Sequence, residues 1–341
     1  MEFHLDANGK EPIYKQIVSQ VERALRDGGL KPGEQLPSMN DLAAAYSISR
    51  ETAKKAYGIL TEKRLIIPRQ GRGFYAADFS ADVKPQVLVI FDKFSVYKQI
   101  MFNSLAEHLD GKAELTILNH NQSVELLKYY LDENLGRFDY YVIAPHFSLD
   151  EESQAMVVRQ LSRIPNRKLI MIDRLQPDFD GNFGAVYQDF ANDICAGLEE
   201  GLSAASTNRH LRVITMPTSL YGSIIRGGVE KFTRKHGISV EYMTEVPDSI
   251  RSGDTFLVLN SQLDVGLVAL TRKIKASGLR IGADVRIISY NEYDMNELIL
   301  GGLTTVSTDF PEMGRLTAEM ILSRTPQKIH CPFHMNRRHT F

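Results

Sequence analysis

The chain of 341 residues lacks the features that mark membrane and secreted proteins. It has no run approaching the ~18 consecutive apolar residues that a transmembrane helix needs. Its first ten residues, MEFHLDANGK, contain no apolar signal segment. Only two cysteines occur, Cys195 and Cys331, and neither belongs to a CxxC pair. We therefore expect a cytoplasmic protein without membrane segments or disulfides.

Sequence motifs of several enzyme classes are also missing. The chain contains no Walker loop, no GxGxxG after its first expected strand, and neither HExxH nor GxSxG. A C-terminal segment from His330 to His334, with His339 beyond it, has no second Cys or His pair that would complete a tetrahedral metal site. We expect a terminal strand there, and neither a metal ion nor a cofactor.

What the chain does have, near its start, is the pattern of two short helices joined by a tight turn. Ser38, with Asp41 three residues later, is a capping-box start, and Ser49 caps a second helix. The second helix has an apolar stripe at helical spacing, formed by Ala53, Ala56, Tyr57 and Leu60. Its other side carries polar and basic residues, namely Arg50, Thr52, Lys54 and Lys55. This arrangement is typical of a recognition helix that enters the major groove of DNA.

A basic hairpin is predicted directly after these helices. Residues 65–67 and 74–75 are strand-like, and the segment PRQGRG between them contains two glycines that permit a tight turn. Arg69 and Arg72 place charge at the tip, which suits a wing that touches phosphates or the minor groove. Residues 50–72 hold seven Lys or Arg against two acids, a net of +5, whereas the whole chain carries −2. Such a concentration of positive charge is typical of a DNA-binding surface.

Four short motifs follow one another across residues 10–76. They are PIYKQI at 12–17, GGLKPGEQLPS at 28–38, SRETAK at 49–54 and QGRG at 70–73. The ordered set resembles the winged helix-turn-helix of GntR-family transcription regulators. The resemblance implies DNA contacts from Arg50, Thr52, Lys54 and Gly71, and Asn40 stands where the family commonly has an arginine. With the capping serines and the wing arginines, the predicted DNA-binding residues are Ser38, Asn40, Ser49, Arg50, Thr52, Lys54, Arg69, Gly71 and Arg72.

Beyond a linker at 77–86, short apolar segments alternate with helical ones. Strands are expected at 87–91, 115–118, 140–144, 169–172, 212–215, 239–242, 255–259 and 286–289, and helices at 95–109, 124–134, 151–163, 222–235 and 263–276. Such alternation indicates parallel sheets with helices on both faces. Two similar halves of ~120 residues suggest two lobes with a cleft between them. The sequence therefore predicts an α/β protein, with a winged helix-turn-helix at 1–76 and a two-lobed core at 87–341.

Part of this core carries a second resemblance. Residues 256–266 (FLVLNSQLDVG), 278–291 (GLRIGADVRIISYN) and 303–314 (LTTVSTDFPEMG) resemble the sugar-responsive core of LacI-type repressors. That core has the periplasmic-binding-protein fold, and the resemblance extends over residues 85–341. GntR-type DNA-binding domains joined to LacI-type cores are known from arabinose- and fucose-type regulators, so the two resemblances are compatible.

Residues at the carboxyl ends of the expected strands are candidates for an effector site, because ligands of such sheets bind at this edge. These residues are Asp92, Phe94, His146, Phe147, Asp173, Arg174, Asn260, Asn291 and Thr308. The LacI resemblance adds Arg226 from the second lobe. Amides, carboxylates and guanidinium groups suit the hydroxyls of a sugar, and a phenylalanine ring suits its apolar face. Arg174 and Arg226 together could instead bind a sugar phosphate.

These observations predict a homodimeric transcription regulator, a repressor of sugar-utilisation genes. Its expected partners are double-stranded operator DNA and a sugar or sugar-phosphate effector that changes operator affinity. The alternative hypothesis is a sugar-modifying enzyme with an accessory nucleic-acid-binding domain. An enzyme would need a tuned acid, base or nucleophile, and no such residue stands out in the sequence.

Overall fold

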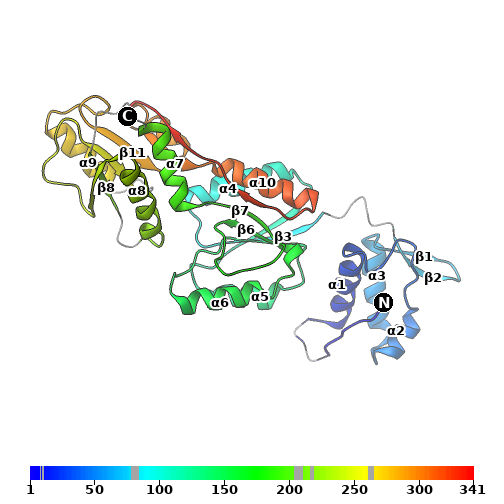
Figure 1. Cartoon of the computed structure of the whole chain (residues 1–341). Helices are drawn as coiled ribbons and strands as arrows, with labels where there is room; N and C mark the ends of the chain where they lie inside the picture. Colours follow the sequence, from blue (N-terminus) through cyan, green and yellow to red (C-terminus); the bar gives the residue numbers. More distant parts are fainter. Residues whose placement is uncertain (8, 10, 78–83, 203–209, 216–218, 260–264) are drawn as a thin grey trace. The chain divides into compact units, whose positions relative to one another are not determined.

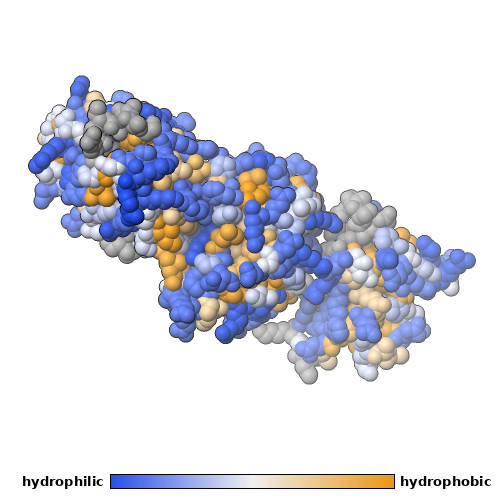
Figure 2. Space-filling view, in the orientation of Figure 1, coloured by the Kyte–Doolittle hydropathy of each residue, from blue (hydrophilic) through white to orange (hydrophobic). Residues whose placement is uncertain are grey.

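The computed structural model describes residues 1–7, 9, 11–77, 84–202, 210–215, 219–259 and 265–341. These residues form two compact units, Met1–Pro85 and Gln86–Phe341 (Figure 1). The face visible in Figure 2 is mainly hydrophilic, with small apolar areas on each unit. No helix in the described parts of the chain is long and apolar enough to cross a membrane.

The first unit contains three helices, α1 (Ile13–Arg26), α2 (Met39–Ala45) and α3 (Arg50–Glu62). Both predicted helix starts are confirmed, because Ser38 accepts a hydrogen bond from the backbone N–H of Asp41 and Ser49 accepts one from that of Thr52. The predicted apolar stripe of α3 is buried. Packing against the rest of the first unit covers this stripe, whereas the opposite side of α3 is exposed to solvent.

Tyr57 fixes α3 to the segment in front of α2. Its ring is fully buried in the core of the first unit, and its hydroxyl donates to the carbonyl of Pro37 at 2.7 Å. Burial, with a smaller contribution from the charge of Asp41, raises the pKa of this hydroxyl above its usual value. The hydroxyl therefore stays a neutral donor, and its hydrogen bond ties α3 to Pro37, before the start of α2.

A hairpin follows α3, as predicted. Strands β1 (Ile66–Arg69) and β2 (Gly73–Ala76) are antiparallel, and Arg69 pairs with Gly73 next to the turn. Gly71 lies in this turn with φ +70°, a conformation that side chains with a Cβ rarely adopt. The hairpin forms the wing of a winged helix-turn-helix.

The second unit begins with a parallel sheet whose strands lie in the order β13-β7-β6-β5-β3-β4. The strands are β3 (Gln86–Phe91), β4 (Glu114–Asn119), β5 (Tyr140–Ile143), β6 (Leu169–Asp173), β7 (Gly184–Tyr187) and β13 (Lys328–His330). The helices that cover it are α4 (Val96–Leu109), α5 (Val124–Asn134), α6 (Glu151–Leu161) and α10 (Phe310–Ser323). Val89 of β3 packs under α4 and α10, whereas its neighbour Ile90 packs under α5 and α6, so helices cover both faces.

A second sheet has the order β14-β12-β11-β10-β8-β9, and it is parallel except for β14. Its strands are β8 (His210–Ile214), β9 (Ser239–Met243), β10 (Thr255–Val258), β11 (Arg286–Tyr290), β12 (Thr304–Thr308) and β14 (Phe333–Asn336). The helices around it are α7 (Phe190–Leu202), α8 (Gly222–His236) and α9 (Val265–Ala276). Leu257 of β10 faces α7 and α8, and the next residue, Val258, faces α9. The predicted α/β class with parallel sheets and helices on both faces is thus confirmed.

The chain passes between the two sheets three times, after β7, after β12 and after β13. The two lobes that the sequence predicts are formed around these two sheets, and the C-terminal segment adds a strand to each. The single terminal strand expected near His330 is in fact two strands in different sheets. Pro332 separates them, since it has no backbone N–H to continue a ladder.

Expected strands and helices from β3 to β11 are confirmed to within about two residues, but α7 and α10 are not among the expected helices. Internal glycines weaken the helical pattern of both, and close packing accounts for those glycines. A Cβ at Gly197 of α7 would lie 2.5 Å from the ring of Phe333. One at Gly314 of α10 would lie 2.4 Å from the carbonyl oxygen of Met101 in α4.

Candidate nucleic-acid interface and effector site

The exposed side of α3 carries basic residues that the sequence assigns to DNA. Arg50 and Lys54 are exposed one turn apart, and Lys54 lies 3.8 Å from Glu51 in a solvent-exposed ion pair. Such a pair contributes little to stability, so Lys54 can exchange it for a phosphate. Thr52 is half-buried, and its hydroxyl lies 2.8 Å from that of Ser49 at the start of the helix.

Two other basic residues of this region are engaged within the first unit. The ammonium of Lys55 lies 4.0 Å from the centre of the Tyr14 ring, and that of Lys63 lies 2.7 Å from a carboxylate oxygen of Glu22. Both contacts connect α3 to α1. The basic residues of this region are therefore of two kinds. Lys55 and Lys63 contact other residues of the first unit, whereas Arg50 and Lys54 lie on the exposed face of α3.

The remaining DNA-binding candidates lie at the start of α2 and on the wing. The hydroxyl of Ser38 donates to the Asp41 carboxylate at 2.7 Å, and Asn40 is exposed in the first turn. On the wing, the Arg69 guanidinium lies 4.4 Å from the centre of the Tyr75 ring. The backbone carbonyl of Arg72 accepts a hydrogen bond from the side-chain amide of Gln35 at 2.9 Å, which anchors the turn and leaves the guanidinium exposed.

In the second unit, charged side chains meet at the carboxyl ends of β3, β5 and β6. Lys98, in the first turn of α4, lies with its ammonium 3.4 Å from Asp92 Oδ1 and also forms an ion pair with Asp173 Oδ2. His146 Nε2 lies 2.8 Å from the same Asp173 oxygen, although the alignment is not that of a hydrogen bond. All four side chains are buried. We call these four residues the polar cluster.

The polar cluster holds its charges in spite of burial. Burial by itself would raise the pKa values of Asp92 and Asp173, but Lys98 and His146 beside them hold both below their usual range. Burial would likewise lower the pKa of Lys98, whereas Asp173 and Asp92 raise it above its usual value. At neutral pH the cluster therefore contains two carboxylates facing one ammonium.

Several buried polar atoms near this edge have no hydrogen-bond partner within the described residues. In the first sheet these include Asp92 Oδ1 and His146 Nε2, and beside the second sheet they are the hydroxyls of Tyr221 and Tyr290 and Oδ1 of Asn291. An unsatisfied buried polar group costs roughly 1–3 kcal/mol. Hydroxyl groups of a bound ligand would satisfy such atoms, so the two sets together form a candidate binding site.

Tyr221, just before α8, brings the second set of residues against the polar cluster. Its ring centre lies 5.2 Å from the Arg174 guanidinium and 5.0 Å from the His146 ring, and the ring stacks on Phe190 at 4.7 Å. Burial raises the pKa of the Tyr221 hydroxyl above its usual value, with Arg174 opposing the shift. The hydroxyl remains protonated and can donate to a ligand.

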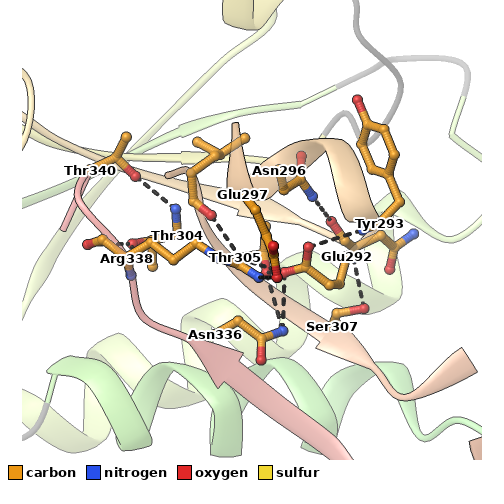
Figure 3. Close-up of polar contacts among 12 residues, drawn as sticks. Glu292, Tyr293, Asn296, Glu297, Thr304, Thr305, Ser307, Asn336, Arg338 and Thr340 are labelled. Carbon is orange, nitrogen blue, oxygen red and sulfur yellow. Dashed lines mark hydrogen bonds and ion pairs between the residues drawn. The ribbon is translucent and has the colours of Figure 1, made fainter. Parts of the chain in front are cut away.

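A network of hydrogen bonds holds the loop that follows β11. Glu292 accepts from Arg338 at 2.7 Å and from the Asn336 amide at 3.1 Å, and its own backbone N–H donates to the Ser307 hydroxyl at 2.9 Å (Figure 3). These contacts tie the loop to β12, to β14 and to the segment beyond β14. Asn291, at the start of the loop, is thereby fixed beside the carboxyl end of β11.

Comparison with known proteins matches the two units to different families. Residues 13–76 match the model of bacterial regulatory proteins of the gntR family. Residues 209–338 match the periplasmic binding protein-like domain. The chain carries a gntR-family domain followed by a periplasmic-binding-protein-like core.

Some known proteins are similar to the gntR-family domain alone, and others are similar to nearly the whole chain. The gntR-family domain is 35% identical over 74 residues to the transcriptional repressor YtrA of Bacillus subtilis, a match that covers 22% of this chain and 57% of YtrA. The chain thus spans little more than half the length of that relative. The arabinose metabolism transcriptional repressor of Geobacillus stearothermophilus is 19% identical over 93% of this chain and 92% of its own length. The Lac repressor bound to ONPG has a similar fold, with a TM-score of 0.59 and 16% identity over 94% of this chain and 95% of its own.

Within the periplasmic-binding-protein-like core, the structure brings some predicted effector residues together. Asp92, His146 and Asp173 form most of the polar cluster, and Arg174 is buried beside it, where it donates to the Pro145 carbonyl at 3.1 Å. Thr308 ends β12 and donates to a glutamine side chain at 2.6 Å.

Other predicted effector residues lie elsewhere. The LacI resemblance assigned Arg226 to the effector, but its side chain is exposed on α8, 2.8 Å from Glu230 and stacked on Tyr242 at 4.1 Å. Phe147 was expected to cover a sugar, but its ring is fully buried in the core and stacks on His120 at 4.1 Å. Phe94 is 55% exposed. Asn260 lies outside the described residues.

Sequence reasoning missed Lys98, Gln188 and Tyr221. Each lies in or just before the first turn of a helix that follows a strand, and this turn faces the same sheet edge as the strand's carboxyl end. A polar or aromatic residue within the first turn after a buried strand is therefore a signal that would have found them.

Proposed function

We propose that this protein is a transcriptional repressor of sugar-utilisation genes, and that a sugar bound beside the polar cluster changes its affinity for operator DNA. The observation that carries the proposal is the set of buried polar atoms without hydrogen-bond partners in the described chain, contributed from both sheets at their carboxyl ends. Sugar hydroxyls both donate and accept hydrogen bonds, so they match a mixed set of such atoms. The gntR-family domain supplies the link to DNA.

An uncharged sugar suits the site better than a sugar phosphate. Asp92 and Asp173 would repel a phosphate, and Lys98 is already shared between them. Arg174 is engaged by a backbone carbonyl and by the ring of Tyr221. A phosphate would therefore meet two carboxylates without a free guanidinium group to bind it.

Operator recognition requires two copies of the chain in this proposal. One winged unit has one short recognition helix, so tight binding needs a twofold-symmetric dimer on a near-palindromic site. We infer that the core supplies the dimer surface. Two of its segments, joined by a ring contact between Tyr97 and Tyr293, carry exposed apolar side chains at Phe94, Val96, Met295 and Leu298.

We infer further that the protein binds its sugar without converting it, and that it acts in the cytoplasm, where the operator is. The alternative of a sugar-modifying enzyme makes a different prediction, because an enzyme would release an altered sugar. Recovery of the ligand after long incubation with the full chain distinguishes the two.

A thermal-shift screen of the full chain tests the proposal. L-Arabinose, D-galactose, L-fucose, D-glucose and glucose 6-phosphate are the probes, since a ligand that binds only the folded state stabilises it by RT ln(1 + [L]/Kd). We expect one uncharged sugar to raise the melting temperature, to be recovered unchanged, and to alter gel retardation of a DNA fragment selected from a random pool by the full chain. Turnover of the sugar, or failure to select any DNA, contradicts the proposal.

A further inference from the structure

Three short segments carry the chain between the two sheets, and hydrogen bonds connect them. These crossover segments are residues 188–189 between β7 and α7, residue 309 between β12 and α10, and residues 331–332 between β13 and β14. The backbone N–H of Asp309 donates to the carbonyl of Pro332 at 2.9 Å. His330 Nε2 lies 2.6 Å from Asp193 Oδ1, so the end of β13 is tied to the first turn of α7. Each crossover segment, or a residue near it, is thus bonded to another.

Gln188 connects the crossover segments to the polar cluster. Its Nε2 donates to Asp173 Oδ1, and its Oε1 accepts a hydrogen bond from the Thr308 hydroxyl at 2.6 Å. Its backbone N–H also donates to the Asp173 carbonyl at 3.2 Å. The side chain is buried. One amide group in the first crossover segment thus joins the floor of the candidate sugar site to Thr308, the residue directly before the second crossover segment.

The chemistry of this position requires an amide. Asp173 is ionised and needs a donor, whereas the Thr308 hydroxyl needs an acceptor, and a glutamine supplies both. A glutamate would place a second carboxylate against Asp173. A methionine of similar length would make neither bond, and it would leave Asp173 Oδ1 and the Thr308 hydroxyl without these partners.

We propose that Gln188 is a positioning residue that couples sugar binding at Asp173 to the arrangement of the crossover segments. The inference rests on the proposed function, because it requires a sugar hydroxyl to reach Asp173. Oδ2 of Asp173 is already taken by Lys98 and His146. A hydroxyl that donates to Asp173 therefore shares Oδ1 with the Gln188 amide. The shared oxygen accepts less strongly from Gln188, and the amide shifts together with its hydrogen bond to Thr308. Sugar-bound and sugar-free states then differ in the contacts between crossover segments, as any ligand-driven shift between two states requires.

The test measures coupling in the full chain. The sugar that binds most tightly among L-arabinose, D-galactose, L-fucose and D-glucose is titrated with and without the selected DNA fragment, and the ratio of the two Kd values is the coupling factor. We expect a ratio of about 5- to 150-fold in either direction for the wild type. Gln188→Met and Thr308→Val should each bring the ratio close to one. Because both remove the same hydrogen bond, the double variant should have the same ratio as either single variant.

Gln176→Met is the matched control. Gln176 is also a buried glutamine near this sheet edge, but its amide donates to Gln154 at 2.9 Å and to the carbonyl of Pro177, not to a crossover segment. This variant should keep the wild-type ratio. A wild-type ratio in Gln188→Met and Thr308→Val overturns the inference, and so does an equal loss of coupling in Gln176→Met. If Gln188→Met does not fold, the ratio measured for Thr308→Val decides.

Failure of the proposed function gives a different result. In that case the wild-type chain binds none of the sugars, or it binds sugar and DNA with a ratio of one. Either result removes the basis of the inference together with the proposed function, whereas a coupled wild type with equally coupled variants removes the inference alone.

Discussion

Asp173 and Asn291 occupy corresponding places in the two sheets of the core. Asp173 ends β6 and Asn291 directly follows β11, and each of these strands is the fourth of its sheet along the chain. Both residues have a positive φ, +74° for Asp173 and +71° for Asn291. Asp and Asn tolerate this conformation better than most residues, and strained backbone is typical of binding sites. Each sheet therefore presents a polar side chain at the carboxyl end of its fourth strand.

This relationship predicts that one substitution of Asn291 can weaken sugar binding without lowering stability. Asn291→Gly should keep the melting temperature or raise it slightly, because glycine adopts a positive φ without strain. It should weaken sugar binding about tenfold, the effect of losing one hydrogen bond of ~1.4 kcal/mol. Asn291→Ala should weaken binding similarly and also lower stability by about 1 kcal/mol. Calorimetric titration and thermal melts check both. Unchanged sugar affinity in the glycine variant would exclude Asn291 from the site.

Lys98→Met should destabilise the core strongly. The substitution leaves Asp92 and Asp173 buried without their shared ammonium, and breaking a buried ion pair in this way costs about 3–5 kcal/mol. Lys128→Met is the control, because its pair with Asp132 is exposed and such pairs contribute little to stability. Urea denaturation of the whole chain compares the two. Equal midpoints would mean that the polar cluster contributes nothing to stability.

His120 should make stability fall between pH 6.5 and about 4. Burial lowers the pKa of His120 from 6.5 to about 4, with the hydrogen bond to Ala144 opposing the shift. Its Nε2 lies 2.9 Å from the Ala144 carbonyl, and its Nδ1 accepts a hydrogen bond from the backbone N–H of Gln122 at 3.1 Å, so the folded chain holds the neutral ring. The unfolded chain binds a proton below pH 6.5 and the folded chain does not until about pH 4. The stabilisation is therefore complete above pH 6.5 and is lost as the pH falls.

Variants check this pH dependence. His120→Asn keeps an acceptor for the Gln122 N–H but cannot titrate, so its stability should fall less between pH 6.5 and 4 than that of the wild type. His108→Asn, at an exposed position of α4, should follow the wild type. If the stabilities of His120→Asn and the wild type fall equally between pH 6.5 and 4, His120 is not the group that causes the fall.

Arg50→Ala and Lys54→Ala should each weaken operator binding and leave sugar affinity unchanged. Both side chains lie on the exposed side of α3, and loss of a base contact costs about 1–3 kcal/mol. Lys112→Ala removes one exposed charge from the surface of the second unit, and this variant should bind DNA like the wild type. Gel retardation at fixed salt compares the three. Wild-type binding by both α3 variants would show that this face of α3 does not contact DNA.

Asp92→Asn and Arg226→Ala distinguish the polar cluster from the position that the LacI resemblance suggests. Asp92 Oδ1 is buried without a hydrogen-bond partner in the described chain, so Asp92→Asn should weaken sugar binding about tenfold or more. Arg226 is exposed and engaged with Glu230 and Tyr242, so Arg226→Ala should have a smaller effect. The opposite ranking in calorimetric titrations would place the sugar against α8.

The sequence by itself determined the winged helix-turn-helix and most of the strands and helices of the core. These features depend on neighbours within a few positions. Ser38 and Ser49 each accept a hydrogen bond from the backbone N–H three residues ahead, and the stripe of α3 follows from helical spacing alone. Asp92, His146 and Asp173 were predictable for a related reason, since each lies at or just beyond the carboxyl end of a buried parallel strand.

Only the tertiary structure decided which side chains meet. Lys98 reaches Asp173 across 75 positions of the chain, and Thr308 reaches Gln188 across 120. No local pattern encodes such contacts, because they depend on the order of strands in a sheet and on the path of the crossover segments. The same reason explains Arg226 and Phe147. The LacI resemblance suggested a binding role for Arg226, and the strand end before it suggested one for Phe147. The packing of α8 and of the first sheet's core places Arg226 in solvent and Phe147 among apolar side chains.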